Sequence, residues 1–174
     1  MSHELSDTAV SVRTFAEGLL SRLAHDLELR ATPSSATFDG QRATLRFRVG
    51  DIAVQGVLKH GRVDSNVLSA SDLKDIEGRI LTSLKASADD HITLELELEG
   101  DVLRGTIQAP CGRTTVRLSA KQEEASPGVL RVTVTGKLSL SALGAGAVKG
   151  PMGSFRLADM VDFEGSCLAR TEAP

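Results

Sequence analysis

The chain has 174 residues and a formal net charge of −3, with positive and negative side chains interspersed. This length fits one domain, over residues 1–174, with a sizeable core, and the lack of a basic stripe interleaved with aromatics argues against nucleic-acid binding. Tryptophan and tyrosine are absent and phenylalanine occurs five times, so any interior is mainly aliphatic.

The N-terminal residues MSHELSDTAV carry neither the basic nor the apolar region of a secretory signal. No apolar run in the chain reaches the length of a membrane span. If Met1 is the native start, we expect a cytoplasmic protein. Cys111 and Cys167 are then expected to be reduced thiols, because disulfides are rare in that compartment.

Most of the chain alternates apolar and polar residues with a period of two, which is typical of strands with one buried face. The alternation is weaker near the N-terminus and strict in 130–140, where the even positions share one face and Arg131 and Thr133 lie on the other. We expect that even-numbered face to point into the protein. The predicted strands are 8–14, 26–31, 43–49, 52–60, 92–99, 102–109, 113–120, 130–140 and 161–169.

One segment, 69–85, has helical periodicity instead. Ser69 followed by Asp72 is typical of a capping box, in which each side chain reaches an unpaired backbone amide. The apolar stripe of this helix is compatible with packing on the barrel or with covering the opening of a cavity. Its members recur at spacings of three and four: Leu73, Ile76, Ile80 and Leu84.

These elements predict an all-β fold, an antiparallel β-barrel of about eight strands with one amphipathic α-helix at about residues 70–85. A closed barrel of about eight strands is either filled by side chains or wide enough to hold one small ligand. Closure also removes the exposed edges of long alternating strands. The alternation of apolar and polar residues does not by itself distinguish a solid core from an apolar tunnel.

Other motifs give only weak evidence for a catalytic, phosphate-binding or metal-binding function. The glycines of 144–150 match neither the dinucleotide nor the P-loop fingerprint, so 141–154 is interpreted as a long loop that could form the mouth of the barrel. His25 and Asp26 lack an accompanying nucleophile motif, which favours a structural, hydrogen-bonded His25 at the start of a strand. The histidines show no metal-binding spacing, and we expect neither a metal nor another cofactor.

Four stretches, in this order, carry a resemblance to a known family: FAEGLLSRLAHD (15–26), VLSASDLKDIEGRILTSL (67–84), GTIQAPCGRTTVRL (105–118) and SALGAGAVKGPMGSFRLADMVDFE (141–164). In this order the chain resembles the bacterial YceI-like family of lipocalin-like barrels, which bind polyisoprenoid or similar lipid chains. The resemblance implies an eight-stranded lipocalin-like barrel.

The resemblance and the aliphatic interior together predict non-enzymatic binding, storage or transport of a long apolar ligand: a polyisoprenoid, an isoprenoid quinone or a fatty chain. The expected partners are that ligand and no nucleic acid, and a homodimer is left open. One alternative is a packed barrel serving as a protein-interaction or scaffold module, and another is an enzyme using His25 and Asp26 on an apolar substrate. The candidate lining residues are Leu45, Phe47, Leu94, Leu96, Leu98, Val116, Leu130, Val132, Val134 and Phe163.

Overall fold

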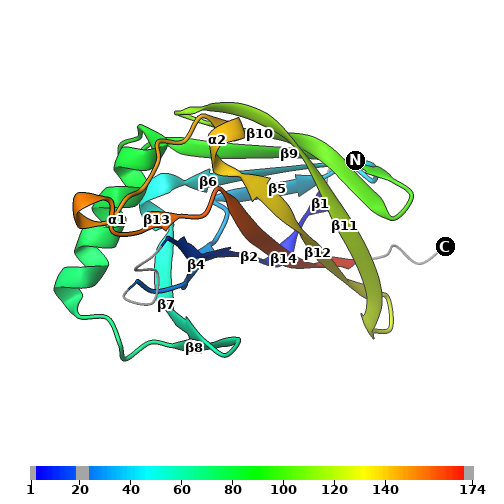
Figure 1. Ribbon diagram of the computed structural model, residues 1–174. Coiled ribbons are helices and arrows are strands. Elements are labelled where there is room, and N and C mark those ends of the chain that lie inside the picture. The colour runs from blue at the N-terminus through cyan, green and yellow to red at the C-terminus, as the bar shows by residue number, and fades with distance from the viewer. Residues whose placement is uncertain (1–2, 19–23, 171–174) are drawn as a thin grey trace.

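The computed structural model describes residues 3–18 and 24–170, and most of them belong to one antiparallel sheet that curls into a barrel (Figure 1). The order of hydrogen-bonded neighbours in this sheet is β1-β5-β6-β9-β10-β11-β12-β14-β2-β4-β7-β8. The strands are β1 (His3–Glu4), β2 (Ser6–Thr14), β3 (Ala16–Glu17), β4 (Leu27–Ala31), β5 (Ser35–Phe38), β6 (Arg42–Arg48), β7 (Ala53–Lys59), β8 (Arg62–Asp64), β9 (His91–Glu99), β10 (Val102–Ala109), β11 (Gly112–Ser126), β12 (Val129–Ser139), β13 (Arg156–Leu157) and β14 (Met160–Arg170).

The N-terminal segment, which consists of β1 and β2, closes the ring of strands. Only Leu5 separates β1 from β2, and the two halves pair with different partners: β1 with β5, and β2 with both β14 and β4. The amide of Leu5 itself donates to the carbonyl of Ala36, at 3.2 Å, so pairing continues through the bend. The predicted fold class, a mostly antiparallel β-barrel with few helices, is confirmed.

The predicted inward and outward faces of the strands agree with the burial of their side chains in the structure. Strands β9 and β10 form a hairpin around the predicted turn at Gly100 and Asp101, with Glu99 opposite Val102. Leu94 and Leu96 are buried whereas Glu95 is exposed. A one-residue slip would reverse this pattern, so the hydrophobic parity fixes the register of the hairpin.

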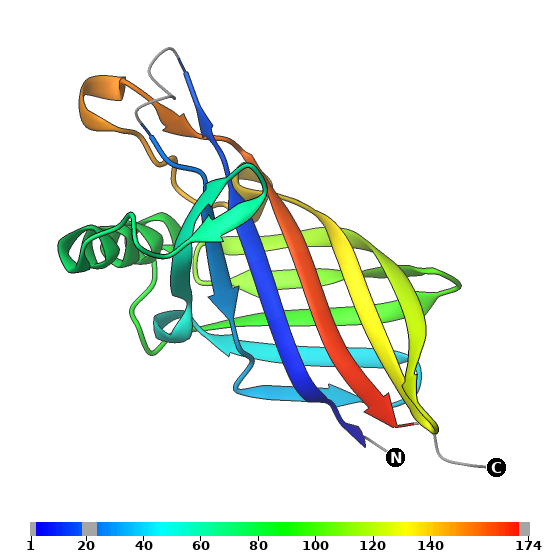
Figure 2. The same cartoon turned by 90° about the horizontal axis from the view of Figure 1, so that it is seen from below.

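The predicted helix is α1 (Ala70–Leu84), and its capping box is present. The Ser69 hydroxyl accepts from the amide of Asp72 at 3.2 Å, and the Asp72 carboxylate accepts from the amide of Ser69 at 2.8 Å. Helix α1 lies at one end of the barrel (Figure 2). Its apolar stripe is half-buried, and Leu84 packs against the core.

A second, unpredicted helix lies at the same end. Residues 141–154 were expected to be a loop, but α2 (Leu140–Leu143) occupies its start. The Ser139 hydroxyl accepts from the amide of Ala142 at 3.1 Å, and the Asp159 carboxylate accepts from the hydroxyl of Ser139 at 2.6 Å. A helix of one turn is too short to show a periodic pattern in sequence, so capping and tertiary contacts form it.

The core fills the barrel from this end towards its middle. Leu143 of α2 is 2% exposed and belongs to the same cluster as residues from β2, β5, β6, β9, β10 and β11. The helix end is therefore closed by packed side chains. The buried cluster consists of Val10, Ala36, Leu45, Phe47, Leu94, Leu96, Ile107, Ala109, Leu118 and Leu143.

Candidate ligand cavity

A cavity of about 120 Å³ occupies the other part of the barrel interior. It reaches from the middle of the barrel towards the end at which β1 and the last residues of β14 lie. Its walls come from β2, β5, β6, β9, β10, β11, β12 and β14, so it is enclosed by the ring of strands. It is lined by Leu5, Thr8, Val10, Phe38, Ala43, Leu45, Leu94, Leu96, Leu98, Leu103, Ala120, Gln122, Val132, Val134, Phe163, Gly165, Ser166, Cys167 and Ala169.

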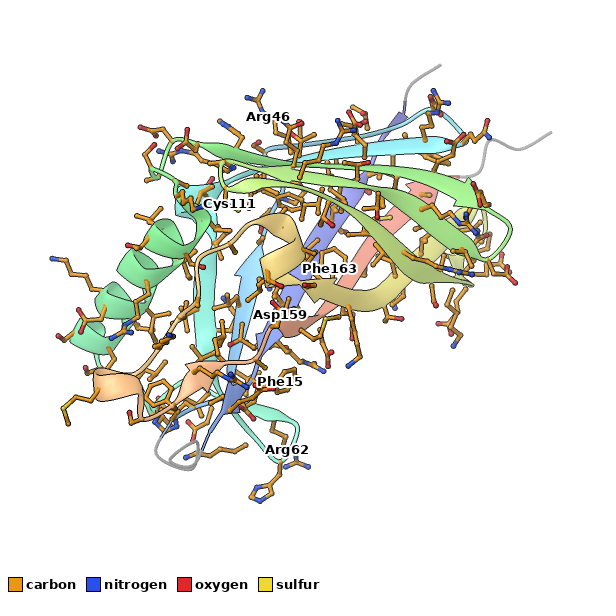
Figure 3. The ribbon with its side chains drawn as sticks, turned by 45° about the horizontal axis from the view of Figure 1, so that its top comes forward. Phe15, Arg46, Arg62, Cys111, Asp159 and Phe163 are labelled. Carbon is orange, nitrogen blue, oxygen red and sulfur yellow. The ribbon has the colours of Figure 1, made fainter. Side chains whose placement is uncertain are left out.

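Most of the candidate lining residues meet at this cavity. Figure 3 shows Phe163 inside the ring of strands, whereas Arg46 points away from it. The predicted inward face of 130–140 also lies on the interior side, since Val132 and Val134 line the cavity while Arg131 is exposed. The predicted residues on the wall are Leu45, Leu94, Leu96, Leu98, Val132, Val134 and Phe163.

Three predicted residues lie outside the lining. Phe47 is two residues beyond Leu45 on β6 and is buried in the packed core at 5% exposure. Val116 packs against that core, and Leu130 is a half-buried residue next to the start of β12. All three are on the expected faces but at other depths along the barrel, which alternation with period two does not reveal.

Other lining residues were not among the candidates. Leu103, Gly165 and Cys167 lie on the same alternating faces as their predicted neighbours, so parity alone would have included them. Leu5 and Phe38 come from the bend between β1 and β2 and from the four-residue strand β5, neither of which was predicted. Short or bent segments carry too few alternating positions to give a strand signal.

The cavity wall is electrically neutral. No aspartate, glutamate, lysine or arginine lines it in the described parts of the chain, and its few polar atoms come from Thr8, Gln122, Ser166 and Cys167. Burial raises the pKa of the Cys167 thiol, so this side chain is uncharged at neutral pH. The buried Thr8 Oγ1 has no hydrogen-bond partner among the described residues. Such a wall favours an uncharged, apolar occupant.

The glycine-rich loop lies at the closed end and does not form the mouth of this cavity. The amide of Gly146 donates to the carbonyl of Ser83 in α1 at 2.8 Å, and the Ser83 hydroxyl donates to the carbonyl of Gly146 at 2.7 Å. Arg79 of α1 also donates to the carbonyl of Lys149, at 3.2 Å. These bonds tie 144–150 to the helix, so the interpretation of this loop as a mouth is wrong for the cavity described here.

The dipeptide His25-Asp26 is outside the cavity as well. Asp26 has the structural role, because its carboxylate accepts from the amide of Ala16 at 2.9 Å and so joins the segment before β4 to β3. His25 is exposed. Within residues 3–18 and 24–170, no group of three or more His, Cys, Asp or Glu side chains is arranged to hold a metal ion.

Comparison with known proteins shows the fold. No model of a protein family matches the chain, and no curated protein matches it. Among solved structures, BcnA from Burkholderia cenocepacia aligns with a TM-score of 0.55 at 12% identity, over 94% of this chain and 97% of BcnA. A polyisoprenoid binding domain from Saccharophagus degradans aligns with a TM-score of 0.59 at 7% identity, over 97% of this chain and 98% of that domain.

The chain has the YceI-like barrel fold. Both alignments span nearly the full length of each partner, so the likeness extends over the whole fold and is not confined to one part of it. The resemblance predicted from the four sequence stretches is therefore confirmed at the level of the fold. None of the helices in the described residues is long and apolar enough to cross a membrane.

Proposed function

We propose that this YceI-like barrel binds an apolar chain without chemical conversion. The observation that carries the proposal is the neutral, aliphatic cavity enclosed by the strands, whose wall includes Leu94, Leu96, Val132 and Val134. Apolar burial contributes about 0.8 kcal/mol per methylene group, so a chain needs few polar contacts to bind. The solved polyisoprenoid binding domain with the same fold supports this reading.

The cavity wall favours a flexible chain over a flat aromatic ring. Phe38 and Phe163 are its only aromatic lining residues among those described, and the chain has no tryptophan or tyrosine. Aromatic ligands gain much of their affinity by stacking on aromatic side chains. The ligand classes that fit are therefore a fatty chain, a polyisoprenoid or the tail of an isoprenoid quinone, held for storage or transport.

Native mass spectrometry of the purified protein, followed by organic extraction and analysis of the extract, tests the proposal. The expected result is a bound species that leaves on extraction and contains an alkyl or isoprenoid chain. Refolding from denaturant without lipid gives an empty control, which should rebind the extracted material. A protein that carries no lipid and binds none when supplied with the extract of its expression host would contradict the proposal.

A further inference from the structure

On both β9 and β14 the cavity lining stops short of the end of the barrel at which α1 lies. On β9 the lining ends at Leu94, and the next inward-facing residue, Ile92, packs against the core instead. On β14 the lining ends at Phe163, and Val161 beyond it is 1% exposed and does not line the cavity. The space is therefore closed at its inner end by a layer of side chains.

Leu118, with Gly136 beside it, belongs to this layer, which we call the floor. They are directly opposite each other on β11 and β12. Leu118 is 3% exposed, and a Cβ added to Gly136 would lie 2.4 Å from Leu118 Cδ2. The leucine thus fills the space that the glycine leaves, one step inward from the lining residue Ala120.

Behind the floor the interior is packed up to the helix end. Ile107 and Ala109 of β10 and Leu143 of α2 are all at most 9% exposed and belong to one cluster with Leu118. A chain that enters the cavity therefore meets a filled core and finds no passage to the end at which α1 and α2 lie.

The size of the cavity sets how much of a chain it can hold. Its volume is about 120 Å³, somewhat below that of an engineered apolar cavity of about 150 Å³ that binds one benzene molecule. About six carbon atoms are therefore accommodated without movement of the wall. A whole polyisoprenoid is several times larger than this.

We propose that the site is a closed-ended socket that takes only the terminal segment, about six carbons, of an uncharged alkyl or isoprenoid chain. The rest of the ligand leaves through the end of the barrel away from α1, and the floor residue Leu118 sets the depth. This inference rests on the proposed binding of an apolar chain and specifies which part of it is enclosed.

Calorimetric titration of the lipid-free protein with linear alcohols from butanol to dodecanol tests the socket. Affinity should rise about fourfold for each added methylene, the equivalent of about 0.8 kcal/mol, while the added carbon enters the cavity. Beyond about six carbons the increase should fall to less than twofold per methylene, because further carbons stay in water. A constant fourfold increase up to dodecanol would overturn the socket while supporting apolar binding, whereas no binding at any length would contradict the proposed function itself.

The chain length at which the affinity stops rising about fourfold per methylene is called the break here. Two substitutions should move this break in opposite directions. Leu118→Ala removes the floor and should shift the break to longer alcohols by about three carbons, the size of the deleted group. Gly165→Ala places a methyl group in the wall, 3.0 Å from Val134 Cγ2 and 3.6 Å from Val10 Cγ2, and should shift the break to shorter alcohols. The shift expected for Gly165→Ala remains testable even if Leu118→Ala does not fold.

Glu164→Gln is the matched control, since Glu164 is exposed and adjoins Gly165 on the same strand. Its series should coincide with that of the unmodified protein. Circular dichroism must show native strand content for each variant before its affinities for the alcohols are interpreted. A folded Gly165→Ala protein with an unchanged break would overturn the assignment of the cavity as the socket.

Discussion

The carbonyl oxygen of Cys111 lies 2.6 Å from the position that a Cβ on Gly144 would occupy. Gly144 ends α2 with a φ of 89°, in the left-handed region, and Cys111 is in the turn between β10 and β11. Figure 3 shows Cys111 at the end of the barrel where α1 lies. The close approach seats α2 directly on that turn, so only a residue without a side chain fits there.

Replacing Gly144 with alanine should therefore destabilise the protein for two reasons. The left-handed conformation costs about 1–2 kcal/mol for a residue with a Cβ, and contact with the Cys111 oxygen adds to this. Gly61→Ala is the control, because Gly61 also has a positive φ, of 76°, but nothing lies within 4 Å of its added Cβ. Urea denaturation should show the larger loss for Gly144→Ala, and equal losses would contradict the seating of α2.

A charge placed on the cavity wall should prevent ligand binding. Val132→Asp introduces a carboxylate among apolar side chains, where an unpaired charge costs several kcal/mol, so affinity for a linear alcohol should fall by more than about tenfold. Thr135→Asp adds the same charge on the exposed face of the same strand and should bind normally. If a folded Val132→Asp protein keeps the affinity of Thr135→Asp, the ligand binds elsewhere.

The Cys167 thiol should report on occupancy of the cavity. Burial raises its pKa above the ordinary value of 9.0, so little thiolate is present at neutral pH. In a Cys111→Ser background, modification by a thiol reagent should be slower than that of free cysteine and should accelerate roughly tenfold per pH unit below the thiol pKa. Saturating octanol should slow it further, and a rate indifferent to octanol would place the alcohol away from Cys167.

Acid should selectively weaken the end of the barrel closed by α2. The hydroxyl of Ser139 and the amide of Ser141 donate to the Asp159 carboxylate and hold its pKa below the ordinary value of 3.8. Because the pKa is lower in the folded state, the contribution to stability is complete above the unfolded value and is lost as pH falls through the folded one.

Asp159→Asn tests this pH dependence. The variant should melt slightly below the unmodified protein at neutral pH, and the difference should shrink as the pH falls below about 4. Thermal melts followed by circular dichroism across this range provide the measurement. A difference that grows on acidification would show that the carboxylate does not have the stabilising role assigned to it.

Sequence reasoning identified the elements that carry many repeated positions. The alternation through Leu94, Leu96 and Leu98 was sufficient to predict β9 and its inward face, and the Ser69–Asp72 pair was sufficient to predict the start of α1. In each case the local pattern and the tertiary environment require the same residues, so the two levels agree.

Elements that depend on partners far away in the sequence were not predicted. Strand β5 has four residues and is held by pairing with β1 and β6, and α2 depends on Asp159, which is about twenty residues away in sequence. Depth within the barrel was equally hidden: Leu45 and Phe47 share one face, yet the first lines the cavity and the second fills the core. Depth follows from strand tilt and stagger around the whole ring, which no single segment encodes.

Closure of the ring has a consequence for biosynthesis. The pairing that completes the barrel joins β2 to β14, so Val12 meets Phe163 across almost the entire length of the chain. During translation β2 leaves the ribosome first and must wait until β14 has been made. Contacts of such long sequence separation form slowly, and until then the unpaired edges of β2 and β12 are open to strands of other nascent chains. Yield in the cell should therefore depend on chaperones that shield those edges more than on the equilibrium stability of the finished barrel.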